Sequence, residues 1–201
     1  MSINQKYTNC YSTIETQKRM IQFSNIASTY NEYLDTLYSY ALHLGFDEQT
    51  AMDAIHDVFY KLCISHKSLS EIENLKFYLT RSLRNRLIDI KRSNKEHTAI
   101  APFEGEEQEK LPFQLNVSIE DEFIEKEDLE EIQQKVENVL SRLTDRQREI
   151  VYLRYIREYS YEEIAEIMQI SVESSRNLIS KSLTKLKESS LSLSLFLLIV
   201  R

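Results

Sequence analysis

The side chains best suited to chemistry are hydrogen-bond donors and cations in the stretch 172–187, "VESSRNLISKSLTKLK". If this stretch is a helix with about 100° per residue, small and apolar residues gather on one face and polar residues on the other. The packed face is predicted to hold Ser175, Ile179, Ser182, Leu183 and Leu186. The polar face is predicted to hold Ser174, Asn177, Lys181, Thr184 and Lys185, with Glu173 at its border and Arg176 at the flank of the packed face. Asparagine pairs with adenine and lysine reaches guanine or phosphate, so the pattern favours contact with a DNA duplex. Spacing alone leaves an ordinary solvated helix as an equal alternative.

A second set of cations lies in the stretch 74–96, which has seven Lys and Arg residues against two acidic residues. On the same helical wheel one side is formed by Leu75, Leu79, Leu83, Leu87 and Ile90. The opposite side is predicted to carry Arg81, Arg84, Lys91, Arg92 and Lys95, with Phe77 and Ile88 among them and Asn85 beside them. Cations interleaved with an aromatic ring suit a nucleic-acid single strand. The alternative is that Phe77 and Tyr78 only pack against neighbouring side chains, which is the commoner role of a lone aromatic ring.

The remaining reactive residue types form no catalytic pattern. Cys10, Cys63 and the four histidines are scattered, and no glycine-rich phosphate loop or nucleophile constellation appears. We therefore expect no enzyme activity, no cofactor and no metal, and a reducing cytoplasm as the location. The N-terminus does not resemble a secretory signal. The apolar tail "LSLSLFLLIV" has ten residues, fewer than the roughly 20 that span a membrane, so we interpret it as a packing or partner segment without membrane insertion.

The elements that must position these faces are predicted to be helices. In 201 residues there are only two glycines and two prolines, and the length suits two small helical domains. A helix is predicted over 23–44, and Asp47 can cap the next one. In that second helix Ala51, Ile55, Val58 and Leu62 fall on one side, and Asp53, His56, Asp57 and Tyr60 on the other. The third helix is predicted to start after "SEIE" (70–73), with a capping box of Ser70 and Glu73.

An acidic linker separates the two halves. Between Glu104 and Glu131 there are twelve acidic residues against two lysines, a net charge of −10, whereas the whole chain carries −7. Helical spacing resumes afterwards and predicts helices near 119–142, 145–157, 161–168 and 172–188. The predicted caps are a box of Thr144 with Gln147, a box of Ser160 with Glu163, and Ser171. The last two helices have the arrangement of a DNA-binding helix-turn-helix.

Three stretches in this order resemble the extracytoplasmic-function (ECF) type of RNA polymerase sigma factor, a minimal form of the sigma-70 family. They are "DAIHDVFYKL", "FYLTRSLRNRLIDIKRS" and "LSRLTDRQREIVYLRYIREYSYEEIAEIMQISVESSRNLISKSLTKLK". The resemblance implies an all-α protein with a region 2-like domain at 20–96, a flexible acidic linker at 97–131, a region 4-like domain at 132–188 and an apolar tail at 189–201. It also implies binding to core RNA polymerase and to promoter DNA, and leaves an anti-sigma factor as a further partner.

The resemblance also assigns roles to residues. Core polymerase is expected to contact Asp53, His56, Asp57 and Tyr60. The minus-ten promoter element is expected to contact Asn74, Phe77, Arg81, Arg84, Asn85, Lys91 and Arg92, with the loop 66–74 shaping a pocket for a flipped base. The minus-thirty-five element is expected to contact Ser174, Arg176, Asn177, Lys181 and Lys185. The chain departs from the family pattern in having His56 and Asp57 for Gln-Glu, Gln169 for a frequent glycine and Leu178 for a frequent arginine.

The acidic balance leads to an expectation about DNA affinity. Affinity for a duplex depends on the phosphates that a protein neutralises, so free protein with this charge is predicted to bind DNA poorly. Polymerase, by taking up the linker and separating the domains, would make both basic faces available together. Two alternatives remain open at this point. One is a stand-alone helix-turn-helix regulator with an N-terminal sensing or interaction module, and the other is a helical scaffold or anti-activator that binds only proteins.

Overall fold

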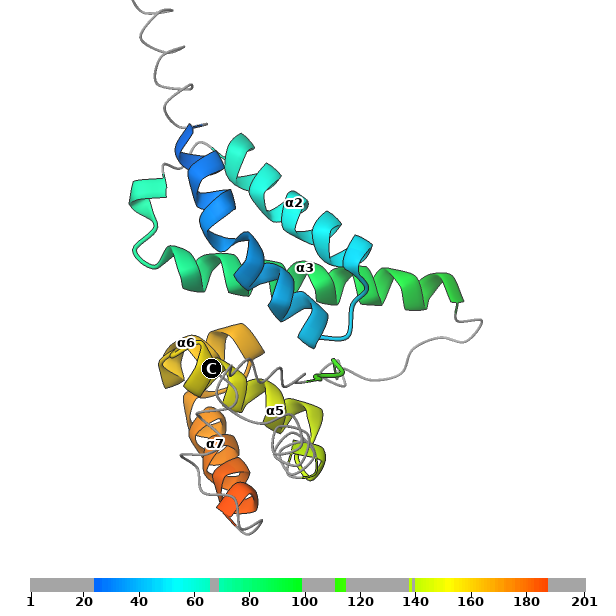
Figure 1. The fold of residues 1–201 in the computed structure, drawn as a ribbon, viewed down its shortest axis with the longest axis vertical. Coiled ribbons are helices and arrows are strands. Elements are labelled where there is room, and N and C mark those ends of the chain that lie inside the picture. The colour runs from blue at the N-terminus through cyan, green and yellow to red at the C-terminus, as the bar shows by residue number, and fades with distance from the viewer. Residues whose placement is uncertain (1–23, 66–68, 99–110, 115–137, 139, 188–201) are drawn as a thin grey trace, which may run out of the picture.

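The computed structural model describes residues 24–65, 69–98, 111–114, 138 and 140–187. A first helix covers 24–43. It is followed by α2 (Glu48–Ile64), the short η1 (Leu69–Glu71), α3 (Leu75–Thr98), α5 (Asp145–Val151), η2 (Tyr152–Ile156), α6 (Tyr161–Met168) and α7 (Val172–Lys187). The described residues contain no strand, so the predicted all-α class is confirmed. In Figure 1 the first helix and α2 lie on one side of α3, and α5, α6 and α7 lie on the other.

The N-terminal group of helices is fixed by a cap and a leucine stripe. Asp47 caps α2, because its carboxylate accepts hydrogen bonds from the Thr50 backbone N–H at 2.9 Å and from the Thr50 hydroxyl at 2.7 Å. These hydrogen bonds from Thr50 lower the pKa of Asp47. The predicted inner face of α2 is buried, as are Leu79, Leu83 and Leu87 of α3. The predicted cap and the packed face of α2 are therefore confirmed, and so are the three central leucines of α3. Leu75 and Ile90 are half-buried, and Ile88, predicted on the cationic side, is buried as well.

The helix α3 starts within one residue of the predicted position, but its cap differs from the prediction. Residues Leu69–Glu71 form the short η1 turn, in which the Ile72 N–H donates to the Leu69 carbonyl at 3.2 Å, and the α-helix begins only at Leu75. The cap is Asn74, whose side-chain oxygen accepts from the Phe77 N–H at 3.0 Å. The capping box predicted at Ser70 was therefore wrong. Asparagine caps a helix as well as serine does, and Asn74 stands next to Leu75, which is partly buried and packs against the core.

The C-terminal group of helices begins at the predicted caps. Both capping boxes are present, Thr144 with Gln147 and Ser160 with Glu163, and Ser171 accepts from the Ser174 N–H at 3.0 Å. The predicted helix 145–157 is not regular throughout, because α5 ends at Val151 and the wider π-type turn η2 follows. In α7 the residues Ser175, Ile179, Ser182 and Leu186 are buried, which confirms the predicted packed face.

Four residues of the predicted linker, 111–114, pack between the two groups of helices. Leu111 and Phe113 are buried, and the Phe113 ring lies 5.7 Å from the His43 ring and 5.5 Å from the Tyr152 ring. His43 Nδ1 lies 2.7 Å from the Gln114 carbonyl oxygen, and the Gln114 N–H donates to the His43 carbonyl at 2.7 Å. Burial lowers the pKa of His43, so the neutral ring donates through Nδ1. This segment, which we call the linker plug, contacts residues of both groups.

Gly45 allows the linker plug to approach the end of the first helix. Its φ is +78°, and a Cβ atom at this position would lie 2.7 Å from Cγ of Pro112. We expect Gly45→Ala to lower the free energy of unfolding by about 2 kcal/mol, from backbone strain and steric overlap together. Urea unfolding of Gly45→Ala in a Pro112→Ala background separates the two causes. The overlap is then absent, so only the backbone share of the loss should remain, and an unchanged unfolding midpoint in both backgrounds contradicts the expectation.

Several predicted segments lie outside the described residues. They are Phe23 at the start of the first helix, positions 66–68 of the loop before α3, positions 99–110 and 115–131 of the linker, positions 119–137 and 139 of the helix predicted over 119–142, position 188 and the tail 189–201. The first two positions of the predicted linker, 97 and 98, belong to α3 instead. Among the residues that the structure does describe, no helix is both long enough and apolar enough to cross a membrane.

Candidate nucleic-acid interface

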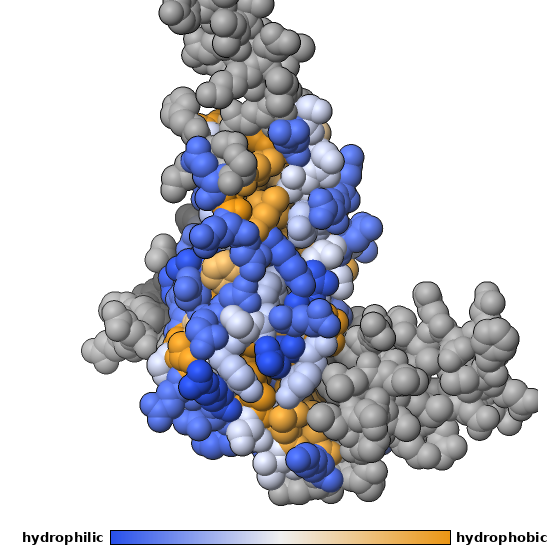
Figure 2. All heavy atoms as spheres, turned by 90° about the vertical axis from the view of Figure 1, so that its left-hand side faces the viewer, coloured by the Kyte–Doolittle hydropathy of each residue, from blue (hydrophilic) through white to orange (hydrophobic). Residues whose placement is uncertain are grey.

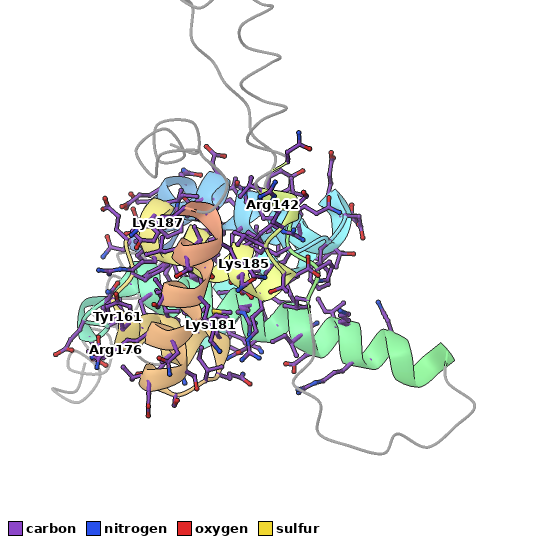
Figure 3. The ribbon with its side chains drawn as sticks, turned by 90° about the horizontal axis from the view of Figure 1, so that it is seen from below. Arg142, Tyr161, Arg176, Lys181, Lys185 and Lys187 are labelled. Atoms are coloured by element: carbon purple, nitrogen blue, oxygen red, sulfur yellow. The ribbon has the colours of Figure 1, made fainter. Side chains whose placement is uncertain are left out.

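The predicted duplex-reading face of α7 is open to solvent. Ser174, Asn177 and Lys181 are exposed, and the face of the molecule that lies on the left of Figure 1 is mostly hydrophilic across its middle (Figure 2). Figure 3 shows Lys181 and Arg176 projecting from α7, with Tyr161 of α6 next to Arg176. Ser174, Asn177 and Lys181 thus lie along one exposed arc of α7, the second helix of the helix-turn-helix, and Arg176 is exposed at the flank of the packed face.

Tyr161 holds two cations at this surface. The Arg176 guanidinium lies 5.5 Å from the centre of the Tyr161 ring and the Arg154 guanidinium 4.8 Å from it. Arg154 also donates to the Tyr159 carbonyl at 2.7 Å, and Arg176 lies 3.4 Å from Glu162. Sequence reasoning missed Tyr161 and Arg154. The available signal was the position of Tyr161 directly after the Ser160 cap, at the first residue of α6.

Lys185 bonds to other residues of the C-terminal group of helices and does not belong to the exposed polar face. Its ammonium group donates to the Gln147 side-chain oxygen at 3.0 Å and lies 3.4 Å from the Arg142 carbonyl oxygen. Figure 3 places Lys185 on the part of α7 that lies near Arg142, away from Arg176. The structure therefore separates Lys185 from the other residues predicted to contact the minus-thirty-five element, and joins α7 to α5 through it.

Ser175 on the packed face of α7 has a buried hydroxyl without a hydrogen-bond partner among the described residues. The Ser182 hydroxyl, in contrast, donates to the Leu178 carbonyl at 2.7 Å. Because an unsatisfied buried hydroxyl costs about 1–3 kcal/mol, we expect Ser175→Ala to leave the free energy of unfolding unchanged or raise it by about 1 kcal/mol. Ser182→Ala is the matched control and should lower it by about 1 kcal/mol. Thermal unfolding of both variants checks this, and a destabilised Ser175→Ala protein contradicts it.

The predicted strand-binding face of α3 is occupied by the C-terminal group of helices. Arg81 pairs with Glu166 at 2.9 Å, and Asn85 accepts from the Gln169 amide at 3.0 Å. The Asn74 amide donates to Glu163 at 2.5 Å. Phe77 is half-buried, with the Arg81 guanidinium 6.0 Å from its ring centre, whereas Lys91 is half-buried and Arg92 exposed in the last turns of the helix.

Arg84 makes the most deeply buried of these contacts. It is only 6% exposed, its Nε lies 2.7 Å from Oε1 of Glu149, and Glu149 is 3% exposed. The Tyr40 hydroxyl donates to the same Glu149 oxygen at 2.9 Å. Burial opposes the charge of Arg84, but the neighbouring Glu149 carboxylate outweighs it, and the pKa of Arg84 lies above its ordinary value. Burial, followed by the charge of Glu149, raises the pKa of Tyr40 well above its ordinary value, so both groups remain donors.

The residues predicted to contact core polymerase share the outer face of α2. His56 stacks on Tyr30 with 5.9 Å between ring centres, and the Tyr30 hydroxyl lies 3.1 Å from His56 Nε2. Asp57 pairs with Arg86 of α3 at 2.7 Å, and Asp53 accepts from the Gln49 amide at 2.9 Å. Tyr60 is 64% exposed and Ile64, one turn further on, is 58% exposed. Sequence reasoning missed Tyr30 and Ile64. Ile64 lies four positions after Tyr60 in α2, a helical spacing that was readable, whereas Tyr30 belongs to the first helix and gave no such signal.

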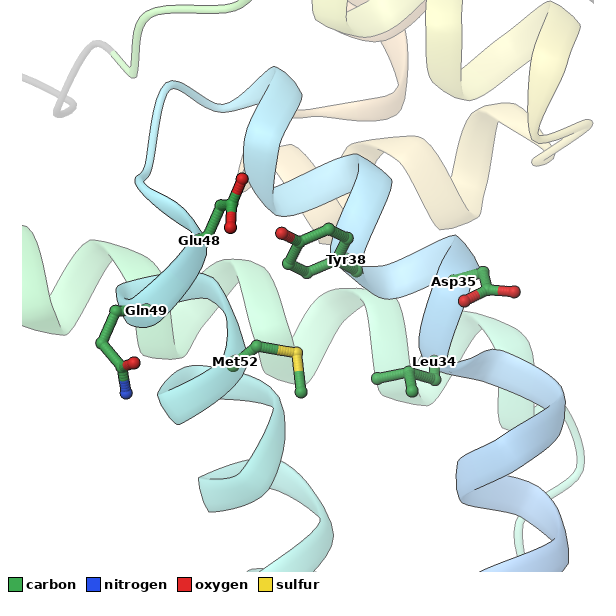
Figure 4. A pocket seen from close by; sticks show the side chains of 6 residues that line it. All are labelled: Leu34, Asp35, Tyr38, Glu48, Gln49 and Met52. Carbon is green, nitrogen blue, oxygen red and sulfur yellow. The ribbon is translucent and has the colours of Figure 1, made fainter.

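A groove of about 350 Å³ lies beside this face, between the first helix and α2. It is lined by Leu34, Asp35, Tyr38, Glu48, Gln49 and Met52 (Figure 4). Burial, followed by the charge of Glu48, raises the pKa of Tyr38, so the phenol remains neutral. The described residues include no group of His, Cys, Asp and Glu side chains that could hold a metal ion.

Comparison with known proteins agrees with this arrangement. Residues 29–97 match the family model "Sigma-70 region 2", and residues 139–188 match "Sigma-70, region 4". The ECF RNA polymerase sigma factor SigM of Bacillus subtilis is 25% identical over 162 residues, which cover 81% of this chain and 93% of that protein. The fold is also that of the sigma factor RpoE from Bartonella quintana, solved in complex with the anti-sigma factor NepR. The identity is 21%, the TM-score is 0.50, and 82% of this chain and 96% of that one are covered.

The two helical domains and their order identify the class of protein. The chain belongs to the sigma-70 family of RNA polymerase sigma factors, and its two regions are those of the ECF type. Sigma factors direct promoter-specific initiation of transcription and are generally not enzymes. The predicted family and general function are therefore confirmed.

Proposed function

We propose that this sigma factor binds core RNA polymerase and the two promoter elements through three separate surfaces. The outer face of α2, with Asp53, His56, Asp57 and Tyr60, binds core RNA polymerase. The cationic face of α3, with Asn74, Phe77, Arg81, Arg84, Asn85, Lys91 and Arg92, binds the minus-ten element. The polar face of α7, with Ser174, Arg176, Asn177 and Lys181, binds the minus-thirty-five duplex.

The exposure of the α7 face is the observation that carries this proposal. Ser174, Asn177 and Lys181 are exposed beside Arg176, while the opposite face of the same helix is buried. A recognition helix needs this division, because it must pack on its own domain and still present side chains to base edges. The Arg154, Tyr161 and Arg176 stack limits the freedom of one cation before DNA arrives.

The polymerase surface is supported by exposed apolar area next to polar groups. Tyr60 and Ile64 lie exposed on α2 beside the paired Asp57. A large aromatic side chain near a few polar groups is typical of the centre of a protein interface. An anti-sigma factor that covers such a surface is a further proposed partner, and the RpoE and NepR complex supports it by analogy. The proposal includes no catalysis by the chain itself and places it in the cytoplasm, where core polymerase acts.

Lys181 provides the test of the α7 assignment. We expect Lys181→Ala to weaken binding of the holoenzyme to promoter DNA about three- to tenfold, and to reduce by about one the slope of affinity against salt concentration, because one phosphate or base contact is lost. Fluorescence anisotropy over a salt series measures both quantities. Lys187→Ala, at the far end of α7, is the charge-matched control and should have little effect. Equal effects of the two substitutions contradict the assignment of this face.

A further inference from the structure

The two halves of the chain meet through residues that were predicted to bind the minus-ten strand. Asn74, Arg81, Arg84 and Asn85 each bond to a side chain of the C-terminal domain. Three of the four partners are carboxylates, namely Glu149, Glu163 and Glu166. We propose that in the free protein the C-terminal domain acts as an internal mimic of DNA, whose carboxylates occupy the places of strand phosphates on α3. The DNA part of this inference rests on the proposed function of α3.

The chemistry of the contacts is that of phosphate recognition. Guanidinium groups bind carboxylates and phosphates through the same charge-assisted hydrogen bonds. Arg84 directs two nitrogens at Glu149, with Nε at 2.7 Å and an Nη nitrogen at 3.4 Å. Arg81 directs one nitrogen at Glu166 at 2.9 Å. The Asn74 amide can donate to a carboxylate or to a phosphate. The side chains of Arg84, Arg81 and Asn74 therefore bond to carboxylates here in the way that they would bond to the phosphates of a strand.

The contacts around the carboxylates exclude a nucleic-acid strand from the same place. The Thr80 and Tyr159 hydroxyls share a hydrogen bond of 2.7 Å in a buried position. The Lys76 ammonium donates to the Arg157 carbonyl at 2.6 Å and lies 5.1 Å from the centre of the Tyr159 ring. Since Arg84 is 6% exposed, a phosphate reaches it only after Glu149 has left. The closed arrangement and strand binding by Arg84 therefore exclude each other.

Masking of the α3 cations is a local cause of weak DNA binding, in addition to the overall negative charge of the chain. A partner that binds only the open form shifts the equilibrium toward it by its difference in affinity for the two forms. Core polymerase, bound through the outer face of α2, would free the α3 face if it holds the C-terminal domain apart. The cations of α3 then exchange one set of anions for another, which limits the energetic cost of opening.

The closed arrangement is tested in the free full-length chain by spin-label distances. Labels go on the native Cys63, exposed on α2, and on Ser180→Cys, exposed on α7, in a Cys10→Ser background. We expect one narrow distance distribution for this protein. The double substitution Glu149→Gln and Glu166→Gln should broaden it and extend it to longer distances. Glu32→Gln with Asp35→Asn, on the exposed side of the first helix, has the same charge change and should leave it narrow. A broad distribution without the interface substitutions overturns the closed state.

Masking is tested on the same proteins with a fluorescein-labelled, sequence-randomised single-stranded DNA of about 12 nucleotides, a length within the range that such sites cover. We expect the double interface variant to bind at least about tenfold more tightly than the unsubstituted chain, and the charge-matched control to bind no more than about twofold more tightly. Glu166→Gln alone changes an exposed carboxylate and cannot disturb the core, so a smaller gain from it supports the proposal even if Glu149→Gln impairs folding. Equal gains in the interface and control variants overturn masking.

The sigma-factor function has a separate readout. Binding of each protein to purified core polymerase is measured by gel filtration, and it does not depend on strand affinity. Equal strand affinity of the interface and control variants, together with intact core binding, contradicts only the inference drawn from the interface. A narrow spin-label distribution without core binding contradicts only the proposed function.

Discussion

Replacing Phe113 with alanine is expected to lower the free energy of unfolding by about 3–5 kcal/mol, the usual cost of removing a buried aromatic ring. The Phe113 side chain is fully buried and lies against the rings of Tyr40, His43 and Tyr152. Because these rings come from both groups of helices, the loss should affect their association as well as their packing. Urea unfolding followed by circular dichroism measures the change, and we expect the single transition of the unsubstituted chain to become two.

Gln114→Ala is the matched control for this substitution. Gln114 is the next residue of the linker plug, and its bonds to His43 are made by main-chain atoms, so alanine retains them. We expect its midpoint to stay within the range of ordinary surface substitutions, about 0.5 kcal/mol. If Phe113→Ala unfolds at the same urea concentration as Gln114→Ala, the linker plug does not stabilise the protein.

Replacing Arg148 with methionine is expected to have the next largest effect, a loss of about 2–4 kcal/mol, since charge-assisted hydrogen bonds contribute about 1.5–3 kcal/mol each and are not additive. Arg148 donates to the carbonyls of Phe113 at 2.7 Å, Leu143 at 2.8 Å and Leu140 at 3.1 Å, and it pairs with Asp145. Methionine keeps much of the side-chain length but leaves these carbonyl oxygens without their donor.

Arg146→Met separates this loss from a general effect of removing a charge. Arg146 lies in the same helix, two residues before Arg148, and is also half-buried. Thermal unfolding should show a clearly lower midpoint for Arg148→Met and a small shift for Arg146→Met. Similar shifts in the two variants would mean that the carbonyl bonds of Arg148 contribute little.

The local features of the fold could be predicted from sequence because each depends on residues within one or two helical turns. The Asp47 cap and the Ser160 box bond to groups three residues away. The packed face of α7 follows from helical geometry alone, and it holds Ser175 and Ile179 as expected. The cap of α3 was predicted wrongly, because Ser70 and Asn74 are equally good caps and the η1 turn that decides between them gives no clear signal.

The contacts between the domains could not be predicted, because they join residues far apart in the chain. Arg84 and Glu149 are separated by 65 positions, and each looks like an ordinary surface charge on its own helix. The same holds for Lys185 and Gln147, separated by 38 positions. A helical wheel gives the direction of a side chain but not its partner, so it placed Arg84 on a face for DNA without showing that a carboxylate occupies that face in this structure. The linker plug lies within an acidic stretch, where its two buried apolar residues were too few to form a pattern.

Run-off transcription tests the central claim, that the chain directs core RNA polymerase to promoters, most directly. A promoter library is transcribed by purified core polymerase with and without this protein, and the transcript starts are mapped. We predict transcripts that appear only when the protein is added, from starts that share two spaced upstream elements. No added transcripts across the library, together with no co-elution of the protein with core polymerase, would contradict the claim.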